Sequence, residues 1–242
     1  MSKSKYLFLT KKDLKMSKPI IVAISGPSGA GKTVLSNKLK DEGFSEIISI
    51  TTRMPRKGEI DGVHYNFSTL ENFNQLAENN GLIEKVHVNG NFYGVEASEA
   101  LRVSSEGKPI VVVAEPDGVR QIKEFCEFNN WDCITVFVNS PLEVLQERLK
   151  NRFDNDLSNL NKDSENYLKD KEKVENAYQS RLHHVLGKEQ EEWVKPAYSE
   201  NSIFDLKFDE FNERVEKSVI EAVNLNVQLM FQNQNKRKFK MP

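Results

Sequence analysis

The sequence lacks the cysteines that a disulfide framework or a structural zinc site would need. Of its 242 residues only two are cysteines, Cys126 and Cys133, and they do not form a CxxC pair. Small disulfide-dependent domains and zinc modules carry more cysteines at closer spacing. We therefore expect both thiols to be small buried side chains in a reducing compartment.

Long apolar runs are also absent. The longest aliphatic stretches, 20–24 and 110–114, fall far short of the roughly 20 residues that span a bilayer. The basic N-terminal start contains only the short apolar stretch 6–9, too short for the apolar region of a signal peptide. The sequence therefore predicts a cytoplasmic protein with no membrane partner.

An excess of charge of one sign is missing as well. The formal net charge is −2, so the whole chain has no footprint for a specific nucleic acid. The local exception is the basic cluster at 236–240, which we interpret as part of a polar, basic C-terminal tail, 226–242. Residues 1–18 are expected to form a flexible extension. A monomer and a homodimer both remain open.

What the sequence does contain is an alternation of buried strands and helical patterns. Aliphatic strands are predicted at 20–25, 110–115 and 134–138, with helical patterns after Lys32, at 119–129 and after Ser140. Shorter strands are expected at 47–50 and 203–208. Strands that are aliphatic throughout are typical of parallel sheets covered on both faces. The pattern predicts an α/β fold with a doubly wound parallel sheet of about five strands.

Two segments depart from this alternation. Residues 54–100 are rich in proline, glycine and aromatics, which indicates a small mixed α/β subdomain inserted into the core. Residues 151–195 are polar and nearly free of β-branched apolar side chains, which indicates a helical lid. Both lie within one predicted domain, 19–225.

A phosphate-binding loop follows the first strand. Residues 26–33, GPSGAGKT, match GxxxxGK[ST] between a predicted strand and a predicted helix, the context that gives this P-loop motif its meaning. Backbone N–H groups and the helix N-terminus can cradle a triphosphate. Lys32 would reach the β- and γ-phosphates in catalysis, and the Thr33 hydroxyl would ligate Mg²⁺. The predicted ATP-binding residues are Gly26, Ser28, Gly29, Ala30, Gly31, Lys32 and Thr33.

A second anion site is predicted shortly after the loop. Arg53 and Arg56 flank Pro55, and guanidinium forks bind phosphate oxygens in bidentate fashion. Tyr65 can add a hydroxyl donor. No guanine-reading NKxD motif accompanies the P-loop, so a GTPase is disfavoured.

Residues 49–67, SITTRMPRKGEIDGVHYNF, resemble the guanylate kinase signature STTRxPRxGExxGxxYxF. The resemblance continues at 82–84 (LIE) and 90–94 (GNFYG) and covers about 20–152. It implies that 54–100 binds a nucleoside monophosphate, NMP, and that ATP with Mg²⁺ phosphorylates GMP or dGMP. It further implies that the monophosphate is held by Arg53, Arg56, Tyr65 and Tyr93 and the base by Ser49 and Glu84.

Glu84 suits guanine chemically, because one carboxylate can accept both the N1–H and the 2-amino group. Two positions depart from the family pattern. Val95 replaces a hydroxyl that would face the base, and Val113 replaces the first acid of Asp-x-Asp, leaving Glu115 for the second. Side chains two apart share a strand face. We hypothesise that Glu115 partly performs the roles of both acids, one near the nucleotide base and one near the water shell of the metal. We also hypothesise that the enzyme discriminates less strictly between bases than the family does.

Lid arginines are expected to neutralise charge on the transferring phosphoryl group, where one arginine contributes about 10³–10⁵ in rate. Arg152 matches the first lid arginine of the family, and Arg181 is the candidate for the second. Arg148 could instead form a surface pair with Glu143 or Glu147. His183 and His184 are interpreted as solvated.

Three alternatives to a GMP kinase remain. They are a broader (deoxy)nucleoside monophosphate kinase, a ribose bisphosphate kinase, and a guanylate kinase-like binding module without catalysis. The last is disfavoured because Lys32, Thr33 and Arg53 are all retained.

Overall fold

A computed structural model describes residues 18–55, 58–88 and 90–238. Its core is a five-stranded sheet in the order β2-β7-β1-β8-β9, and every neighbouring pair is parallel. The doubly wound α/β prediction is confirmed. The strands are β1 (Ile20–Ser25), β2 (Ser45–Glu46), β7 (Ile110–Val113), β8 (Asp132–Val138) and β9 (Leu206–Phe208).

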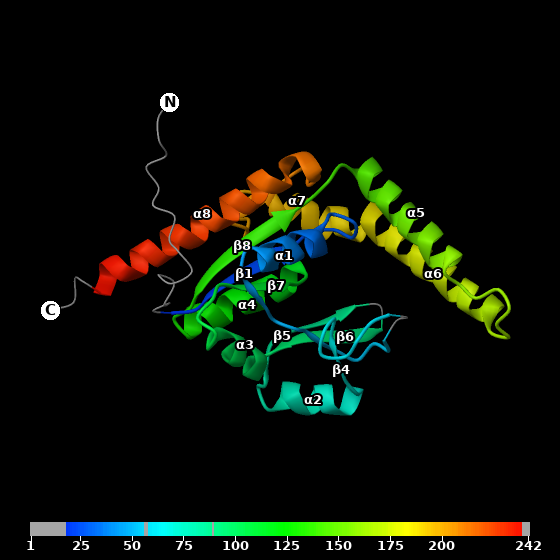
Figure 1. The fold of residues 1–242 in the computed structure, drawn as a ribbon, viewed down its shortest axis with the longest axis horizontal. Coiled ribbons are helices and arrows are strands. Elements are labelled where there is room, and N and C mark those ends of the chain that lie inside the picture. Colours follow the sequence, from blue (N-terminus) through cyan, green and yellow to red (C-terminus); the bar gives the residue numbers. More distant parts are fainter. Residues whose placement is uncertain (1–17, 56–57, 89, 239–242) are drawn as a thin grey trace.

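Helices cover both faces of this sheet, as the aliphatic strands require (Figure 1). Alternate residues of β1 enter two separate apolar clusters, Ile20, Val22 and Ile24 in one and Ile21 and Ala23 in the other. The first cluster is closed by α1 (Lys32–Asp41), α5 (Leu142–Ser158) and α8 (Glu213–Lys238), the second by α3 (Ala97–Ser104) and α4 (Pro116–Phe128).

A second, mixed sheet has the order β4-β3-β6-β5. It comprises β3 (Ile50–Thr51), β4 (Asn66–Phe67), β5 (Leu82–Val88) and β6 (Asn91–Glu96), with α2 (Leu70–Glu78) packed on it through the buried Phe73. The expected single strand at 47–50 is wrong. The chain leaves the main sheet after Glu46 and enters the second sheet at Ile50, so this stretch is a crossing between two sheets.

The segment that follows β8 forms a helical hairpin. Helices α5 and α6 (Tyr167–Leu186) pack along each other, with Phe153 stacked on Tyr178 at 4.6 Å, and project away from the main sheet (Figure 1). A π-helical turn, η1 (Glu189–Val194), and α7 (Lys195–Ala197) return the chain to the core.

The C-terminal helix is longer than expected. Val219, Val223, Val227 and Phe231 are all buried, and they follow one another at four-residue spacing along α8. The apolar stripe carries the helix past the predicted boundary at 225 and on to Lys238. Residues 1–17 and 239–242, including the end of the basic cluster, lie outside the described residues. Within the described ranges, no helix combines the length and apolarity that crossing a membrane requires.

Candidate active site

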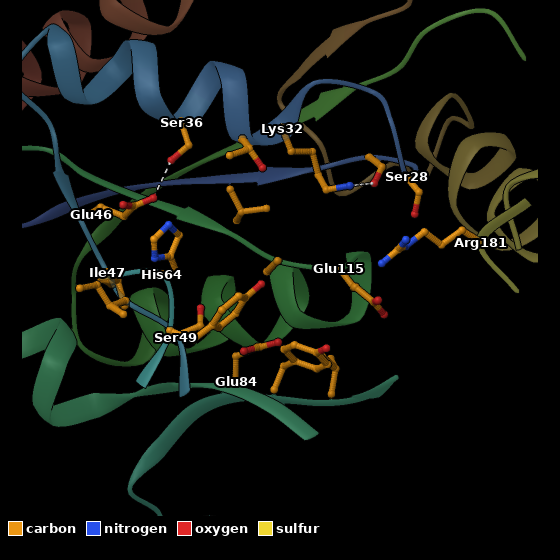
Figure 2. Close-up of a pocket in the computed structure, with 18 of the residues that line it drawn as sticks. Ser28, Lys32, Ser36, Glu46, Ile47, Ser49, His64, Glu84, Glu115 and Arg181 are labelled. Atoms are coloured by element: carbon orange, nitrogen blue, oxygen red, sulfur yellow. Dashed lines mark hydrogen bonds between the residues drawn. The ribbon is translucent and has the colours of Figure 1, made fainter. Parts of the chain in front are cut away.

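A cleft of about 690 Å³ lies where the main sheet, the second sheet and the helical hairpin meet. Its walls include Lys32 from the P-loop, Ser49 from the crossing between the sheets, Tyr93 from the second sheet, and Arg152 and Arg181 from the hairpin. Figure 2 shows Arg181 pointing into this space, Lys32 turned toward the P-loop, and Glu84 on the side away from Lys32, with Glu115 between the two. Residues that are more than 140 positions apart in the sequence, such as Lys32 and Arg181, therefore line the same cleft.

The P-loop runs from the end of β1 into α1 and depends on its glycines. Gly26 has φ 146°, and a Cβ there would lie 1.9 Å from the Val138 carbonyl oxygen. Gly31 has φ 101°, and a Cβ there would lie 2.4 Å from the Phe211 ring. No side chain of the described residues caps α1, so its first-turn N–H groups can serve an anion.

Lys32 folds back onto the loop. Its Nζ donates to the Gly26 and Pro27 carbonyl oxygens at 2.7 and 3.0 Å. Burial lowers the pKa of Lys32, while the nearby carboxylates of Glu189 and Glu115 act in the opposite direction. The ammonium thus sits at the loop mouth, between two acids, where a polyphosphate could replace its carbonyl partners.

Arg148 braces the loop from behind. It donates to the Gly29 carbonyl at 2.9 Å, the Phe211 carbonyl at 2.8 Å and Ser140 Oγ at 3.2 Å. The expected surface pair with Glu143 or Glu147 is wrong, because the side chain turns inward to bind these oxygens. Arg148 thereby ties the Gly29 peptide of the loop to α5 and to the segment at Phe211.

Arg53 is held by a local carboxylate. Its Nη1 and Nη2 donate to the two Glu59 oxygens at 2.9 Å each, and its guanidinium lies 5.3 Å from the Tyr65 ring centroid. Burial disfavours the charge, but Glu59 and then Tyr93 outweigh it and raise the pKa of Arg53. Arg53 Nε is buried and meets no hydrogen-bond partner within the described residues. A donor in that position suits an oxyanion, and Arg56 lies outside the described residues.

Glu84 lies on the wall opposite the P-loop and is 4% exposed. A Cβ on Gly118 would come within 2.5 Å of Glu84 Oε1, so the carboxyl fills space that only glycine leaves open. Burial, and next the nearby Glu115, raises the pKa of Glu84 to about 8. Burial also raises the pKa of Glu115 to about 7, with Lys32 opposing and Glu189 adding to the rise.

The two departures from the family pattern occupy different environments. Val113 lines the cleft beside Glu115. Val95 pairs with Glu84 across β5 and β6 but is 1% exposed and belongs to an apolar cluster that includes Ala114 and Val119. Val95 is therefore a buried core residue adjacent to Glu84.

The hairpin contributes both arginines that the sequence analysis singled out. Arg152 is half-exposed and 4.0 Å from Asp156, whereas Arg181 extends from α6 into the cleft (Figure 2). His183 is exposed, and His184 is partly exposed and lines the cleft.

Sequence reasoning missed two acids that contact the anion sites. Glu59, six residues beyond Arg53, stands inside the quoted signature, and its spacing after two arginines was a usable signal. Glu189 accepts hydrogen bonds from Ser28 of the P-loop. It lies in a polar stretch that ends in a π-helical turn, where neither the 3.6-residue nor the two-residue period applies.

A glycine-rich loop between the first strand and helix of a parallel sheet, with an inserted sheet and a helical lid around one cleft, defines a P-loop nucleotide-binding fold. The family model "Guanylate kinase" matches residues 16–185. The chain therefore belongs to the guanylate kinase family.

Individual relatives agree with this assignment. The chain is 35% identical over 140 residues to the guanylate kinase of Clostridioides difficile (strain 630), covering 57% of this chain and 66% of that protein. It is 35% identical over 141 residues to that of Clostridium perfringens (strain SM101 / Type A), covering 57% of this chain and 63% of that one. The matched region thus spans just under two thirds of these relatives.

A solved structure, the guanylate kinase from Anaplasma phagocytophilum, aligns over 90% of this chain and 89% of its own, with a TM-score of 0.55 and 20% identity. At that identity the likeness supports the fold.

Proposed function

We propose that this protein is an ATP-dependent nucleoside monophosphate kinase that phosphorylates GMP and dGMP. The observation that carries the proposal is the single cleft into which the P-loop, the second sheet and the lid arginines all open. Direct transfer needs donor and acceptor phosphates within reach of each other, and one chamber provides that. The curated relatives carry the name guanylate kinase.

The donor triphosphate is bound by the loop N–H groups and by Lys32, which exchanges its Gly26 and Pro27 partners for phosphate oxygens. The acceptor phosphate replaces the Glu59 carboxylate as the hydrogen-bond partner of the Arg53 guanidinium and also accepts from the buried Arg53 Nε–H. Tyr65 and Tyr93 donate from their hydroxyl groups. The acceptor is already an anion, so no general base is needed. Arg152 and Arg181 offset the charge that spreads over the equatorial oxygens.

Residues that would hold Mg²⁺ fit a phosphate-bound ion. Thr33 is the second residue of α1 and lines the cleft, and Glu115, directly before α4, lies close enough to Lys32 to interact with its charge. The described residues contain no cluster of three or more His, Cys, Asp or Glu that could hold a metal alone, which agrees with an ion bound mostly through substrate phosphates. When bound, Mg²⁺ would neutralise charge on the β- and γ-phosphates.

Base selection is assigned to Glu84. An ionised carboxylate accepts both Watson–Crick donors of guanine, whereas adenine presents an acceptor at N1. A pocket that hydrogen-bonds its substrate rejects analogues that leave those groups unpaired. Because Val113 replaces an acid on the cleft wall, a second candidate function is a kinase with broader selection among deoxynucleoside monophosphates.

An ADP-release assay with GMP, dGMP, AMP, dAMP, CMP, dCMP, dTMP and UMP tests this proposal. We expect the highest kcat/KM for GMP or dGMP, and Lys32→Met to remove turnover because the donor loses its ammonium. Lys38→Met is the matched control, since Lys38 lies on the same helix but pairs with Glu216 outside the cleft. Comparable rates with several deoxynucleotides would favour the broader kinase.

If no nucleotide supports ADP release, the kinase proposal is wrong. Turnover with a ribose bisphosphate would then indicate the sugar kinase, and MgATP binding without turnover a guanylate kinase-like binding module.

A further inference from the structure

A buried carboxylate from beyond the lid touches the P-loop. Glu189 is 4% exposed, and its two oxygens accept from the Ser28 N–H and the Ser28 hydroxyl, both at 2.9 Å. The two residues are 161 positions apart in the chain. Because burial of an unpartnered carboxylate is costly, this two-point contact stabilises one arrangement of the loop and the distant segment.

The location of Glu189 gives the contact a mechanical consequence. It is the first residue of η1 and follows α6 after a break at Gly187. Helix α6 carries Arg181 into the cleft, eight positions before Glu189. The extra residue per turn of a π-helix rotates side chains out of the α-helical register, and such turns concentrate at functional sites. Glu189 is therefore the point at which the end of the second lid helix is joined to the donor loop.

Both oxygens of Glu189 accept hydrogen bonds from Ser28, which is the hydrogen-bonding pattern of a carboxylate. Lys32 is close enough that Glu189 acts to raise the pKa of Lys32, and Glu189 also contributes to the raised pKa of Glu115. Charge-assisted hydrogen bonds are stronger than neutral ones, so an amide in place of this carboxylate would weaken the link.

We propose that Glu189 is a positioning residue for phosphoryl transfer: by gripping Ser28 it fixes the P-loop relative to the helix that carries Arg181. The inference rests on the proposed kinase function. Glu189 acts through Ser28 and α6 on the donor side of the cleft, so it affects the rate of transfer more than the binding of the acceptor.

Steady-state kinetics of the full chain separate these effects. For Glu189→Ala we expect kcat to fall about 10–100-fold, as a small misplacement of reacting groups does, with the KM for GMP within about twofold. Glu189→Gln, which keeps the length and one acceptor, should lose less. Ser28→Ala should lose activity too, and the double variant Ser28→Ala/Glu189→Ala should be no slower than Glu189→Ala alone. Glu192→Gln is the control, an exposed acid of the same turn that pairs with Lys188.

Independent, multiplying losses in the double variant would overturn the proposal, because they would mean that Glu189 acts without Ser28. A kcat of Glu189→Gln equal to that of the parent would overturn it, and so would a gain in kcat/KM, which would mean that the carboxylate obstructs the donor.

Hydrogen exchange provides a readout that does not depend on GMP kinase activity. In the ligand-free chain, Glu189→Gln should speed amide exchange in both 26–33 and 187–197, while Glu192→Gln should leave 26–33 unchanged. Unaltered exchange at 26–33 in Glu189→Gln would contradict the link even if the parent proved inactive toward every nucleotide, whereas inactivity with the expected exchange would count against the kinase proposal alone.

Discussion

The two proposed anion sites, the P-loop and Arg53, are built in opposite ways. The donor loop is a short contiguous motif that distant residues support: Arg148 on Gly29, Phe211 against Gly31 and Glu189 on Ser28. The acceptor arginine, Arg53, is held by Glu59 only six residues away and by the ring of Tyr65. The comparison shows that a short motif can identify a binding loop, while the contacts that hold the loop in place come from residues far away in the sequence.

The largest expected difference between the two sites is the loss of stability when a glycine is replaced by alanine. Gly26→Ala places a Cβ 1.9 Å from the Val138 carbonyl and should lower the free energy of unfolding by about 3 kcal/mol or more. Gly58→Ala, on the acceptor side, also starts from a positive φ but meets nothing within 4 Å, so about 1–2 kcal/mol is expected. Urea denaturation of both variants measures the contrast, and equal losses would show that the acceptor turn is packed as tightly as the donor loop.

The next prediction compares Arg148, which binds carbonyl oxygens behind the P-loop, with Arg152, which lines the cleft. Arg148→Met removes the hydrogen bonds to the Gly29 and Phe211 carbonyls and should cost about 2–3 kcal/mol of stability, with a raised KM for ATP. Arg152→Met should leave the unfolding free energy within about 0.5 kcal/mol, since the side chain is half-exposed, but lower kcat by about 10³-fold or more. Thermal melts and kinetics of the pair distinguish the two roles. A stable Arg148→Met with only kcat reduced would place Arg148 with the lid arginines instead.

The smallest effect is a pH dependence on the acceptor side. Glu84, with a pKa of about 8 in the empty cleft, is mostly protonated at pH 7, while guanine requires the ionised form. Binding of GMP should therefore weaken as the pH falls from 8 to 6, by up to about tenfold per unit, and level off above 8. The nearby Glu115 adds to this rise in the pKa of Glu84, after the larger effect of burial.

Calorimetric titration of GMP at several pH values measures this slope. Glu84→Gln is the control, because it retains the ionisation of the phosphate but removes that of residue 84. A GMP affinity with the same pH profile in both proteins would show that Glu84 does not release a proton on binding.

Much of the fold followed from local patterns. The aliphatic stretches 20–25 and 134–138 indicated a buried parallel sheet, and the strands at those places confirm it. The helix through 226–238 was missed because its polar composition outweighed the apolar stripe of Val227 and Phe231. The strand expected at 47–50 failed because two sheets meet there, and periodicity reports burial but not which sheet a strand joins.

The roles assigned to the site residues, from Lys32 to Arg181, remain predictions, although most of these side chains line one cleft. Arg148 was misjudged for a physical reason. A helical arginine beside glutamates looks identical in sequence whether it faces solvent or a loop carbonyl, and only packing distinguishes the two.

By itself, the sequence determined the chemistry that is encoded in short contiguous segments: the glycine-rich loop with its lysine, the arginines of 53–56, and the alternation that builds a parallel sheet. These depend on neighbours along the chain, so spacing alone reveals them. Tertiary structure alone decided that Glu189 meets Ser28, that Arg148 supports Gly29, and that burial beside a second acid raises the pKa of Glu84. Such contacts join residues that chain folding brings together across more than a hundred positions or that share a low-dielectric wall, and no local pattern records them.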